Sequence, residues 1–335
     1  MALRVGINGF GRIGRLILRS IIENKRQDID VVGINDLGSI DLNAHLLRYD
    51  STHGIFPGEI KVEGDVLDVG TGPIKFMAER DPGNLTWKDL GTDVVMESTG
   101  LFVDRISAGK HIEAGASKVL LSAPGKDVDL TVVYGVNQDK LEAQHKIVSN
   151  GSCTTNCLAP IADILNKSIG IEKGYMTTIH SYTSDQRPLD KNHPDPRRAR
   201  ACAINMVPST TGAAKALGQV LPELNGKLDG AAIRVPTPNV SLIDLTFLSG
   251  RKTSIEEVNE SIKEAANNSL KGILNYVSDT LVSTDFNHNP ASSNFDATET
   301  QVVDGNFVRI LSWYDNEWGY SNRMPDTAIA MHNAV

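Results

Sequence analysis

The stretch Leu3-Arg-Val-Gly-Ile-Asn-Gly-Phe-Gly-Arg-Ile-Gly14 decides the fold of the N-terminal half of the chain. Its first six residues are typical of a short buried strand, and the residues after Gly14 have the apolar spacing of a helix. The three glycines between them form the G-x-G-x-x-G pattern, which binds dinucleotides when it joins a strand to a helix. Gly9 permits the tight turn, Gly11 lets the backbone approach a pyrophosphate, and Gly14 lets the helix pack closely on the strand.

A second predicted strand, Ile29–Asn35, is followed by Asp36, which lies 22 residues after Gly14. An acidic residue at about this distance binds the ribose hydroxyls of the adenosine half of the cofactor. Because a carboxylate there repels a 2′-phosphate, the sequence favours NAD over NADP. The alternative interpretation of Asp36 is a helix-capping aspartate.

The rest of the chain predicts two domains of different architecture. Up to residue 122, strands alternate with helices, which indicates an α/β fold of the Rossmann type with a doubly wound parallel sheet. Residues 55–75 look instead like short hairpin strands inserted into that frame. After Cys153 the pattern predicts an α+β domain with a mixed or antiparallel sheet. We expect residues 1–152 and 317–335 to form the NAD-binding domain, with the C-terminal helix returning to it, and residues 153–316 to form the catalytic domain. Further strands are predicted at 92–98, 118–122, 231–237, 240–248 and 307–313, and helices at 106–114 and 254–267.

The segment Ser-Asn-Gly-Ser-Cys-Thr-Thr-Asn-Cys-Leu-Ala-Pro, residues 149–160, contains the predicted nucleophile. Cys153 follows a serine and begins a helical pattern, so its thiol is expected at a helix N-terminus, which favours the thiolate. The flanking hydroxyl and amide side chains favour an anion pocket. A buried, inert cysteine is the alternative for Cys153 and the expectation for Cys157.

His180 is the predicted base, because it ends a β-branched strand pattern over residues 174–180. His193 and His288 lie in predicted loops and remain possible. The other histidines lie in polar segments and are expected to be solvated: His45, His53, His111, His145 and His332.

A long polar stretch over residues 181–210 has little periodicity, and loops of this length are usually functional or interfacial. Its arginines, Arg197, Arg198 and Arg200, form either a solvated charge cluster or, for at least one of them, a phosphate-binding group. Because the backbone of such a loop needs hydrogen-bonding partners, we expect it to pack against another copy of the chain.

The composition of the 335 residues limits the class of protein. An apolar content of 40% is enough for two cores, and no apolar run approaches the 18 residues of a membrane span. The net charge of −8 is wrong for a protein that mainly binds nucleic acid. Three cysteines lack metal-ligand spacing, which predicts no metal site and a cytoplasmic protein. The chain enters a strand at once, so no signal peptide is expected.

Five motifs resemble the phosphorylating glyceraldehyde-3-phosphate dehydrogenases, at residues 5–15, 152–160, 208–215, 234–240 and 313–321. The resemblance extends over essentially the whole chain. It implies oxidation of D-glyceraldehyde 3-phosphate to 1,3-bisphosphoglycerate with NAD and inorganic phosphate, through a cysteine thioester. It also implies a homotetramer in which the long loop lies beside the neighbour's cofactor site.

The resemblance further implies a role for each matching residue. Cys153 would be the nucleophile and His180 the base. Thr183 and Arg234 would hold the substrate phosphate, Ser152, Thr154, Thr211 and Gly212 the attacking phosphate, and Arg198 both. Gly9 and Gly11 would receive the pyrophosphate together with the backbone N–H groups of Arg12 and Ile13. Asp36 would bind the adenosine ribose, Arg80 and Ser122 the adenine half, Asn316 the nicotinamide amide, and Tyr320 would pack near the ring.

Two alternatives remain open at this point. Residues 286–290 are shared with the erythrose-4-phosphate dehydrogenases, which makes that enzyme the runner-up. A nucleotide-dependent binding module for RNA or a partner protein is the third hypothesis. Lys191 and Asn192 depart from the common family pattern at the edge of the adenosine site, so strict preference for NAD over NADP is also open.

Overall fold

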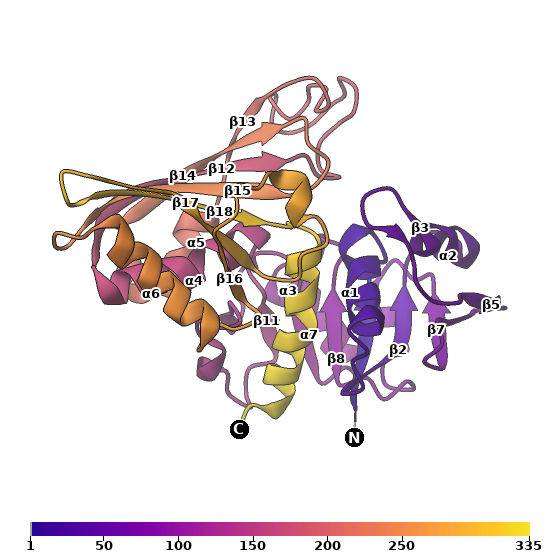
Figure 1. Cartoon of the computed structure of the whole chain (residues 1–335). Coiled ribbons are helices and arrows are strands. Elements are labelled where there is room, and N and C mark those ends of the chain that lie inside the picture. Colours follow the sequence, from indigo (N-terminus) through magenta and orange to yellow (C-terminus); the bar gives the residue numbers. More distant parts are fainter. Residues whose placement is uncertain (1) are drawn as a thin grey trace. The chain divides into compact units, whose positions relative to one another are not determined.

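The computed structural model describes residues 2–335 and contains two compact units, each built on its own sheet (Figure 1). The first unit comprises the residues up to Ser152 together with Ser321–Val335, and the second comprises Cys153–Tyr320.

The first unit contains a nine-stranded sheet in the order β10-β11-β9-β8-β1-β2-β7-β6-β5. Neighbours from β10 to β7 pair in parallel, and only the hairpin strands β5 and β6 are antiparallel, which confirms the predicted Rossmann-type sheet and the hairpin insertion. The strands are β1 (Leu3–Asn8), β2 (Ile29–Asn35), β5 (Lys61–Glu63), β6 (Val66–Asp68), β7 (Pro73–Met77), β8 (Val94–Glu97), β9 (Lys118–Leu121), β10 (Leu130–Thr131) and β11 (Ile147–Ser149), with a separate pair β3 (Tyr49–Asp50) and β4 (Gly54–Ile55). The helices are α1 (Arg12–Glu23), α2 (Ile40–Arg48) and α3 (Arg105–Glu113), with single 3₁₀ turns at Pro82–Asn84 and Gln138–Lys140.

The central strands of this sheet are buried along most of their length, as strands covered on both faces must be. Val5 and Ile7 of β1 and Ile34 of β2 are fully buried. Leu16 and Ile17 of α1 are equally buried, so the helix that follows the glycine turn is held by apolar packing.

The second unit contains a seven-stranded mixed sheet in the order β13-β14-β12-β15-β18-β17-β16, which confirms the predicted α+β architecture. Its parallel pairs are β12 with β14 and β16 with β17, and the other neighbours are antiparallel. Its helices lie on one face of the sheet in Figure 1. The strands are β12 (Ile171–Ser181), β13 (Val207–Thr210), β14 (Leu228–Val235), β15 (Ser241–Ser249), β16 (Leu274–Val277), β17 (Ser293–Val303) and β18 (Phe307–Tyr314). The helices are α4 (Cys153–Ser168), α5 (Ala213–Val220), α6 (Ile255–Asn267) and the start of α7 (Trp318–Asn333), with 3₁₀ turns at Pro222–Leu224 and Ser283–Phe286.

Several features differ from the sequence expectations. The predicted loop over residues 181–210 is shorter, because Val207–Thr210 forms β13 and pairs antiparallel with β14. β16 and β17 were not predicted, because β17 carries buried polar residues such as Asn294 and Asp296, which interrupt an apolar pattern. The prediction that His111 is solvated is wrong, since its side chain on α3 is fully buried.

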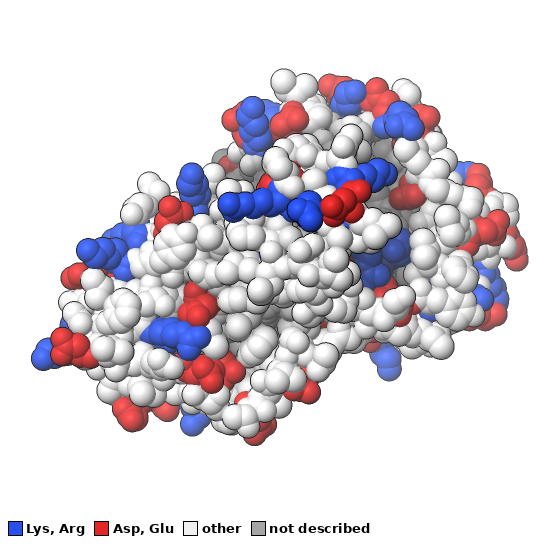
Figure 2. Space-filling view, turned by 90° about the horizontal axis from the view of Figure 1, so that it is seen from above, with Lys and Arg blue, Asp and Glu red and all other residues white. Residues whose placement is uncertain are grey.

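The charged side chains carry no dominant sign on the face shown in Figure 2, where basic and acidic groups are interspersed. This distribution fits the net charge of −8 and differs from the basic stripe of a nucleic-acid-binding surface. Within the described chain, no helix is both long and apolar enough to cross a bilayer.

Candidate active site

The glycine turn in the first unit has the shape that a pyrophosphate requires. Gly9 has φ +89°, a conformation that side chains with a Cβ rarely adopt. A Cβ at Gly14 would lie 2.0 Å from the carbonyl oxygen of Gly9, so only glycine lets α1 start this close to the turn. A Cβ at Gly11 would meet no atom within 4 Å, so this glycine borders open space.

The first turn of α1 presents its backbone N–H groups at Arg12 and Ile13, directly after Gly11. A helix N-terminus of this kind is a ready site for phosphate oxygens. The Arg12 guanidinium is turned to the Asp50 carboxylate, 2.6 Å away. The Arg12 side chain is therefore engaged in an ion pair, and only its backbone belongs to the turn.

The Asp36 carboxylate connects the end of β2 to the glycine turn. Oδ2 accepts a hydrogen bond from the Phe10 N–H at 2.9 Å, and Oδ1 accepts one from the Gly38 N–H at 2.8 Å. Ser122 directly follows β9, and the exposed Arg80 lies three residues after β7. The predicted cofactor residues of this unit thus all follow carboxyl ends of sheet strands or the turn between β1 and α1, where ligands bind in this architecture.

The second unit brings Cys153 and His180 together, as predicted. Cys153 is the first residue of α4, and His180 is the penultimate residue of β12. Cys153 Sγ lies 3.5 Å from His180 Nε2, within hydrogen-bonding range for sulfur. His180 is 3% exposed and Cys153 is half-buried, so the thiol is the more accessible member of the pair.

Arg234 lies directly beside His180, because the parallel register of β12 and β14 pairs these two residues. Its Nη1 is 2.8 Å from His180 Nδ1 and 3.0 Å from the Ser181 carbonyl oxygen. Among the residues that the structure describes, none provides a hydrogen-bond partner for the buried Arg234 Nε. Arg234 therefore keeps one guanidinium donor for a further acceptor.

Burial dominates the electrostatics of this pair. It raises the pKa of the Cys153 thiol, although the Arg234 charge and hydrogen bonds with Thr154 act in the opposite direction. The backbone hydrogen bonds at the helix terminus also lower this pKa, as expected, but burial outweighs them. Burial, and secondly the Arg234 charge, lowers the pKa of His180 to about 3. Burial thus disfavours the charged form of both groups.

The His180 pKa predicts a specific dependence of stability on pH. Since its pKa falls from 6.5 to about 3 on folding, only the unfolded chain binds this proton between these values. The stability that depends on a neutral His180 is fully present above pH 6.5 and is lost as the pH falls toward 3. Through this group alone, the free energy of unfolding should fall by about 2 kcal/mol between pH 7 and pH 5. Urea unfolding at both pH values should show a smaller acid loss for His180→Asn than for the wild type. An equal loss in both proteins would contradict the buried neutral imidazole.

Several of the predicted anion-binding residues lie on or beside β13 and β14, which pair antiparallel with Val207 opposite Arg234 and Thr210 opposite Ala231. Arg198 donates from Nε to Ser209 Oγ at 3.1 Å and from Nη1 to Asp185 Oδ2 at 3.0 Å. Its charge helps to lower the His180 pKa, so it acts within electrostatic range of the catalytic pair. The half-buried Thr211 and the exposed Gly212 follow β13 and precede α5, and Thr183 is half-buried shortly after β12.

Tyr314 is a residue of this site that the sequence analysis missed. Its hydroxyl lies 2.9 Å from both Thr154 Oγ1 on α4 and Thr178 Oγ1 on β12, and its ring meets His180 edge-on at 5.9 Å. Tyr314 thus ties the helix that carries the thiol to the strand that carries the base. The Thr154 hydroxyl is buried in this contact, and the residue before Cys153, Ser152, is half-buried.

Asn316 is fixed by two serine hydroxyls. Its Oδ1 accepts hydrogen bonds from Ser181 Oγ at 2.8 Å and Ser241 Oγ at 3.0 Å. These bonds set the orientation of the amide and leave its Nδ2 as a donor for another group. Tyr320 lies in the first turn of α7 and is 4% exposed.

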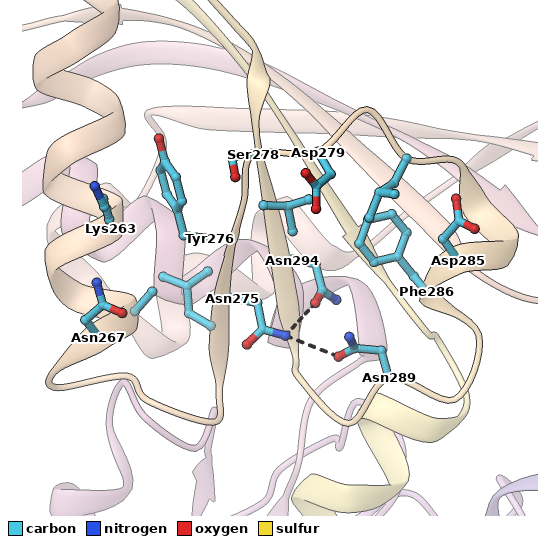
Figure 3. A pocket seen from close by; sticks show the side chains of 14 residues that line it. Lys263, Asn267, Asn275, Tyr276, Ser278, Asp279, Asp285, Phe286, Asn289 and Asn294 are labelled. Carbon is cyan, nitrogen blue, oxygen red and sulfur yellow. Dashed lines mark hydrogen bonds between the residues drawn. The ribbon is translucent and has the colours of Figure 1, made fainter.

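A cavity of about 480 Å³ lies between α6 and β16 (Figure 3), and neither Cys153 nor His180 lines it. Its lining residues fall between Lys263 and Asn294, and none of them is a predicted site residue. Across residues 2–335, no cluster of three or more His, Cys, Asp or Glu side chains could hold a metal ion.

Comparison with known proteins gives a consistent result along the chain. Residues 3–105 match the family described as glyceraldehyde 3-phosphate dehydrogenase, NAD binding domain, and residues 152–316 match its C-terminal domain. The glyceraldehyde-3-phosphate dehydrogenase of Xanthobacter flavus is 62% identical over 331 residues, which cover 99% of each chain. The same-named proteins of Cereibacter sphaeroides and Geobacillus stearothermophilus are 57% and 55% identical, over 99% and 98% of each chain.

Proposed function

The chain belongs to the glyceraldehyde-3-phosphate dehydrogenase family, and from this premise we propose that it oxidises D-glyceraldehyde 3-phosphate to 1,3-bisphosphoglycerate with NAD and inorganic phosphate. The observation that carries the proposal is the 3.5 Å contact between Cys153 Sγ and His180 Nε2, with Arg234 beside the imidazole. A nucleophile, a base and a cation in this arrangement suit the conversion of a phosphorylated aldehyde into an acyl group on sulfur.

His180 acts in this reaction as a neutral base. His180 Nδ1 faces the Ser181 carbonyl oxygen at 2.7 Å, which only accepts, and Arg234 Nη1 at 2.8 Å, which only donates. In the tautomer that donates from Nδ1 to the carbonyl oxygen, Nε2 faces the thiol as an acceptor, and Arg234 Nη1 donates to the same carbonyl oxygen at 3.0 Å. Sγ adds to the aldehyde carbon, and the thiol proton passes through Nε2 to the former carbonyl oxygen, which becomes a hydroxyl. His180 then removes the hydroxyl proton as hydride leaves the same carbon, which produces a thioester. Phosphate displaces the thiol from the acyl group and releases the product.

Two groups of residues bind the two anions in this proposal. Thr183 and Arg234 hold the substrate phosphate, and the unpaired Arg234 Nε supports this role. Arg198 serves both anions, since its guanidinium lies against β13 and carries the charge that the anions need. The attacking phosphate is held by Ser152, Thr154, Thr211 and Gly212.

The first unit binds NAD, which supplies the hydride acceptor when it is bound. The open space at Gly11 and the backbone N–H groups of Arg12 and Ile13 suit its pyrophosphate. Asp36 binds the adenosine ribose. Arg80 and Ser122 contact the adenine half. From the second unit, the Asn316 Nδ2 orients the nicotinamide amide, and Tyr320 packs near the nicotinamide ring.

Asp36 is expected to set the preference for NAD over NADP. Asp36→Asn removes the charge that repels the 2′-phosphate but keeps an oxygen for the Phe10 N–H, whereas Asp36→Ala removes both. In both variants the dissociation constants of the two cofactors should approach each other, and Asp36→Ala should weaken NAD binding by about 10-fold. Titration with each cofactor measures this. A wild-type protein that binds NADP as well as NAD would contradict the role of Asp36 and implicate the Lys191 and Asn192 departure.

A single assay tests the reaction. Purified protein that receives D-glyceraldehyde 3-phosphate, NAD and phosphate should form NADH, and omission of phosphate should stop turnover at the acyl-enzyme. Comparable, phosphate-independent turnover of erythrose 4-phosphate would instead identify the runner-up enzyme, which the named relatives do not favour.

The assembly and location are also part of the proposal. Exposed apolar side chains on the long loop, Leu189, Ile204 and Met206, support its packing against another copy in a homotetramer. Light scattering should then give about four times the subunit mass of 36.3 kDa. The free cysteines Cys153, Cys157 and Cys202 fit a cytoplasmic enzyme.

A further inference from the structure

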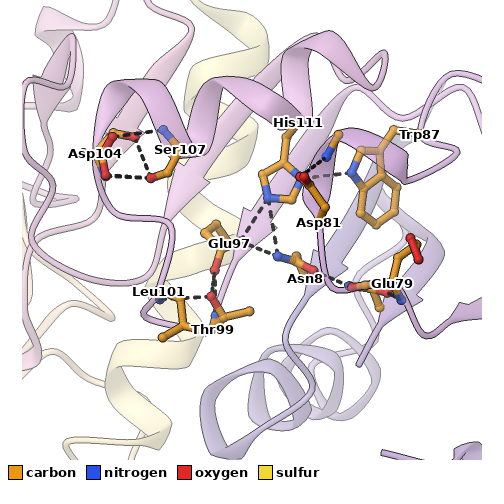
Figure 4. Close-up of polar contacts among 12 residues, drawn as sticks. Asn8, Glu79, Asp81, Trp87, Glu97, Thr99, Leu101, Asp104, Ser107 and His111 are labelled. Carbon is orange, nitrogen blue, oxygen red and sulfur yellow. Dashed lines mark hydrogen bonds and ion pairs between the residues drawn. The ribbon is translucent and has the colours of Figure 1, made fainter. Parts of the chain in front are cut away.

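Behind the glycine turn, buried side chains of the first unit form a continuous hydrogen-bonded network (Figure 4). Its centre is the carboxylate of Glu97, the last residue of β8, which is 1% exposed. Asn8 Nδ2 donates to Oε2 at 2.5 Å, and His111 Nε2 lies 3.0 Å from the same oxygen. Thr99 donates its backbone N–H to Oε1 at 2.7 Å and its hydroxyl to the same atom. The two carboxylate oxygens of Glu97 thus face four hydrogen-bonding groups.

Trp87 fixes the direction of the His111 hydrogen bonds. Its Nε1 lies 3.0 Å from His111 Nδ1, and an indole N–H can only donate. Nδ1 is therefore the acceptor, and Nε2 carries the proton that faces Glu97. Trp87 is fully buried against β1 and β2, where a Cβ at Gly6 would lie 2.6 Å from its ring and a Cβ at Gly33 3.1 Å. Packing of the indole ring consequently holds the Trp87 N–H in place as the donor to His111.

On the other side of Glu97, the network continues across the sheet. Asn8 Oδ1 accepts a hydrogen bond from Asn35 Nδ2 at 2.7 Å. Asn35 also forms two hydrogen bonds with the backbone of Glu79. Its Oδ1 accepts from the Glu79 N–H at 2.8 Å, and its Nδ2 donates to the Glu79 carbonyl oxygen at 2.8 Å. The network therefore links the carboxyl ends of β8, β1 and β2 to the segment after β7, and these four strands are neighbours in the sheet.

Each of the backbone positions fixed in this way adjoins a residue of the proposed cofactor site. Asn8 precedes Gly9, Asn35 precedes Asp36, and Glu79 precedes Arg80. Thr99 also supports the turn directly, since a Cβ at Gly9 would lie 2.7 Å from its methyl carbon.

We propose that Glu97 is a positioning residue of the dinucleotide site, whose carboxylate holds the loops after β1, β2, β7 and β8 in the geometry that binds the cofactor. Glu97 is too deeply buried to touch a ligand, so it acts through Asn8 and Thr99. This inference rests on the proposed binding of NAD by the first unit.

The first test replaces the carboxylate by a carboxamide of the same shape. In Glu97→Gln an NH₂ group faces donors that the carboxylate accepted, so at least one buried donor loses its partner. The dissociation constant of NAD should rise by about 10-fold. Alkylation of Cys153 by iodoacetamide without NAD should keep its wild-type rate, because that thiol belongs to the second unit. A change that merely destabilised the fold would lower the unfolding temperature but leave the NAD affinity of the folded protein unchanged.

Asp104→Asn is the matched control. Asp104 caps α3, where its carboxylate accepts from the N–H groups of Ile106 and Ser107 (Figure 4). Asparagine caps a helix as well as aspartate does, so the same chemical change outside the network should leave NAD affinity unchanged.

Two substitutions of the half-buried Thr99 provide a second test that does not depend on replacing a core residue. Thr99→Val keeps the shape but loses the hydroxyl that donates to Glu97, whereas Thr99→Ser keeps the hydroxyl and loses the methyl group. Valine should weaken NAD binding and serine should preserve it. The opposite order, or NAD affinity equal to wild type in Glu97→Gln, would overturn the inference. A wild-type protein that does not bind NAD would instead count against the proposed function.

Discussion

Replacement of Cys153 by serine is expected to lower kcat by at least about 10⁴-fold, while NAD affinity stays unchanged. A serine hydroxyl is far less acidic and less nucleophilic than a thiol, and it forms an ester in place of the activated thioester that phosphate attacks. The cofactor is bound by the first unit in this proposal, so its affinity reports correct folding independently of turnover. Steady-state formation of NADH and a titration with NAD measure the two quantities.

Cys157→Ser is the matched control on the same helix, one turn after Cys153. Its Sγ is fully buried, 3.4 Å from Ser293 Oγ, and burial raises its pKa to about 12. A serine there can keep the polar contact, so the variant should retain turnover. Loss of activity in Cys157→Ser, together with activity in Cys153→Ser, would exchange the proposed roles of the two cysteines.

His180→Asn should slow hydride transfer by roughly 10²- to 10⁴-fold, because an amide cannot accept the hydroxyl proton. Single-turnover measurements of NADH formation give this rate directly. The same variant should shift the reaction of Cys153 with iodoacetamide to higher pH, since the acceptor 3.5 Å from Sγ is lost. The burial that raises the thiol pKa would then act without a neighbouring base.

An unchanged alkylation profile would mean that His180 does not assist ionisation of the thiol. The helix terminus and Arg234 would then have to supply the stabilisation of the thiolate. If hydride transfer were also unchanged, the assignment of His180 as base would fail.

Local patterns were sufficient to predict the parts of the molecule that depend on neighbouring residues. The glycine turn was predictable because each glycine meets a steric demand within a few residues of itself, and the structure shows these demands at Gly9 and Gly14. The helix that begins at Cys153 and the strand that ends near His180 were likewise encoded in short runs of sequence. The parallel character of the first sheet followed from how strands and helices alternate, whereas the second sheet was predicted only as mixed or antiparallel.

Contacts between distant residues were not predictable in this way. The Tyr314 hydroxyl meets Thr154, a residue 160 positions away, and Glu97 meets Asn8, 89 positions away. Nothing near His111 in the sequence shows that Trp87 and Glu97 will bury it. That burial outweighs the helix terminus in setting the thiol pKa was not predictable for the same reason, because desolvation depends on how the whole unit packs around Cys153.

The order of synthesis has a consequence for the first unit. Its sheet is complete once β11 has been made, but Ser321–Val335 emerges from the ribosome only after the entire second unit. Until then Asn24 lacks its partner Asn322, Arg26 lacks Asp326, and the surfaces that bury Met324 and Met331 are open to water. The nascent first unit therefore has to persist with an uncovered apolar face, the kind of surface on which chaperones act. Release of the last helix, rather than completion of the sheet, should be the moment at which this unit becomes resistant to proteolysis.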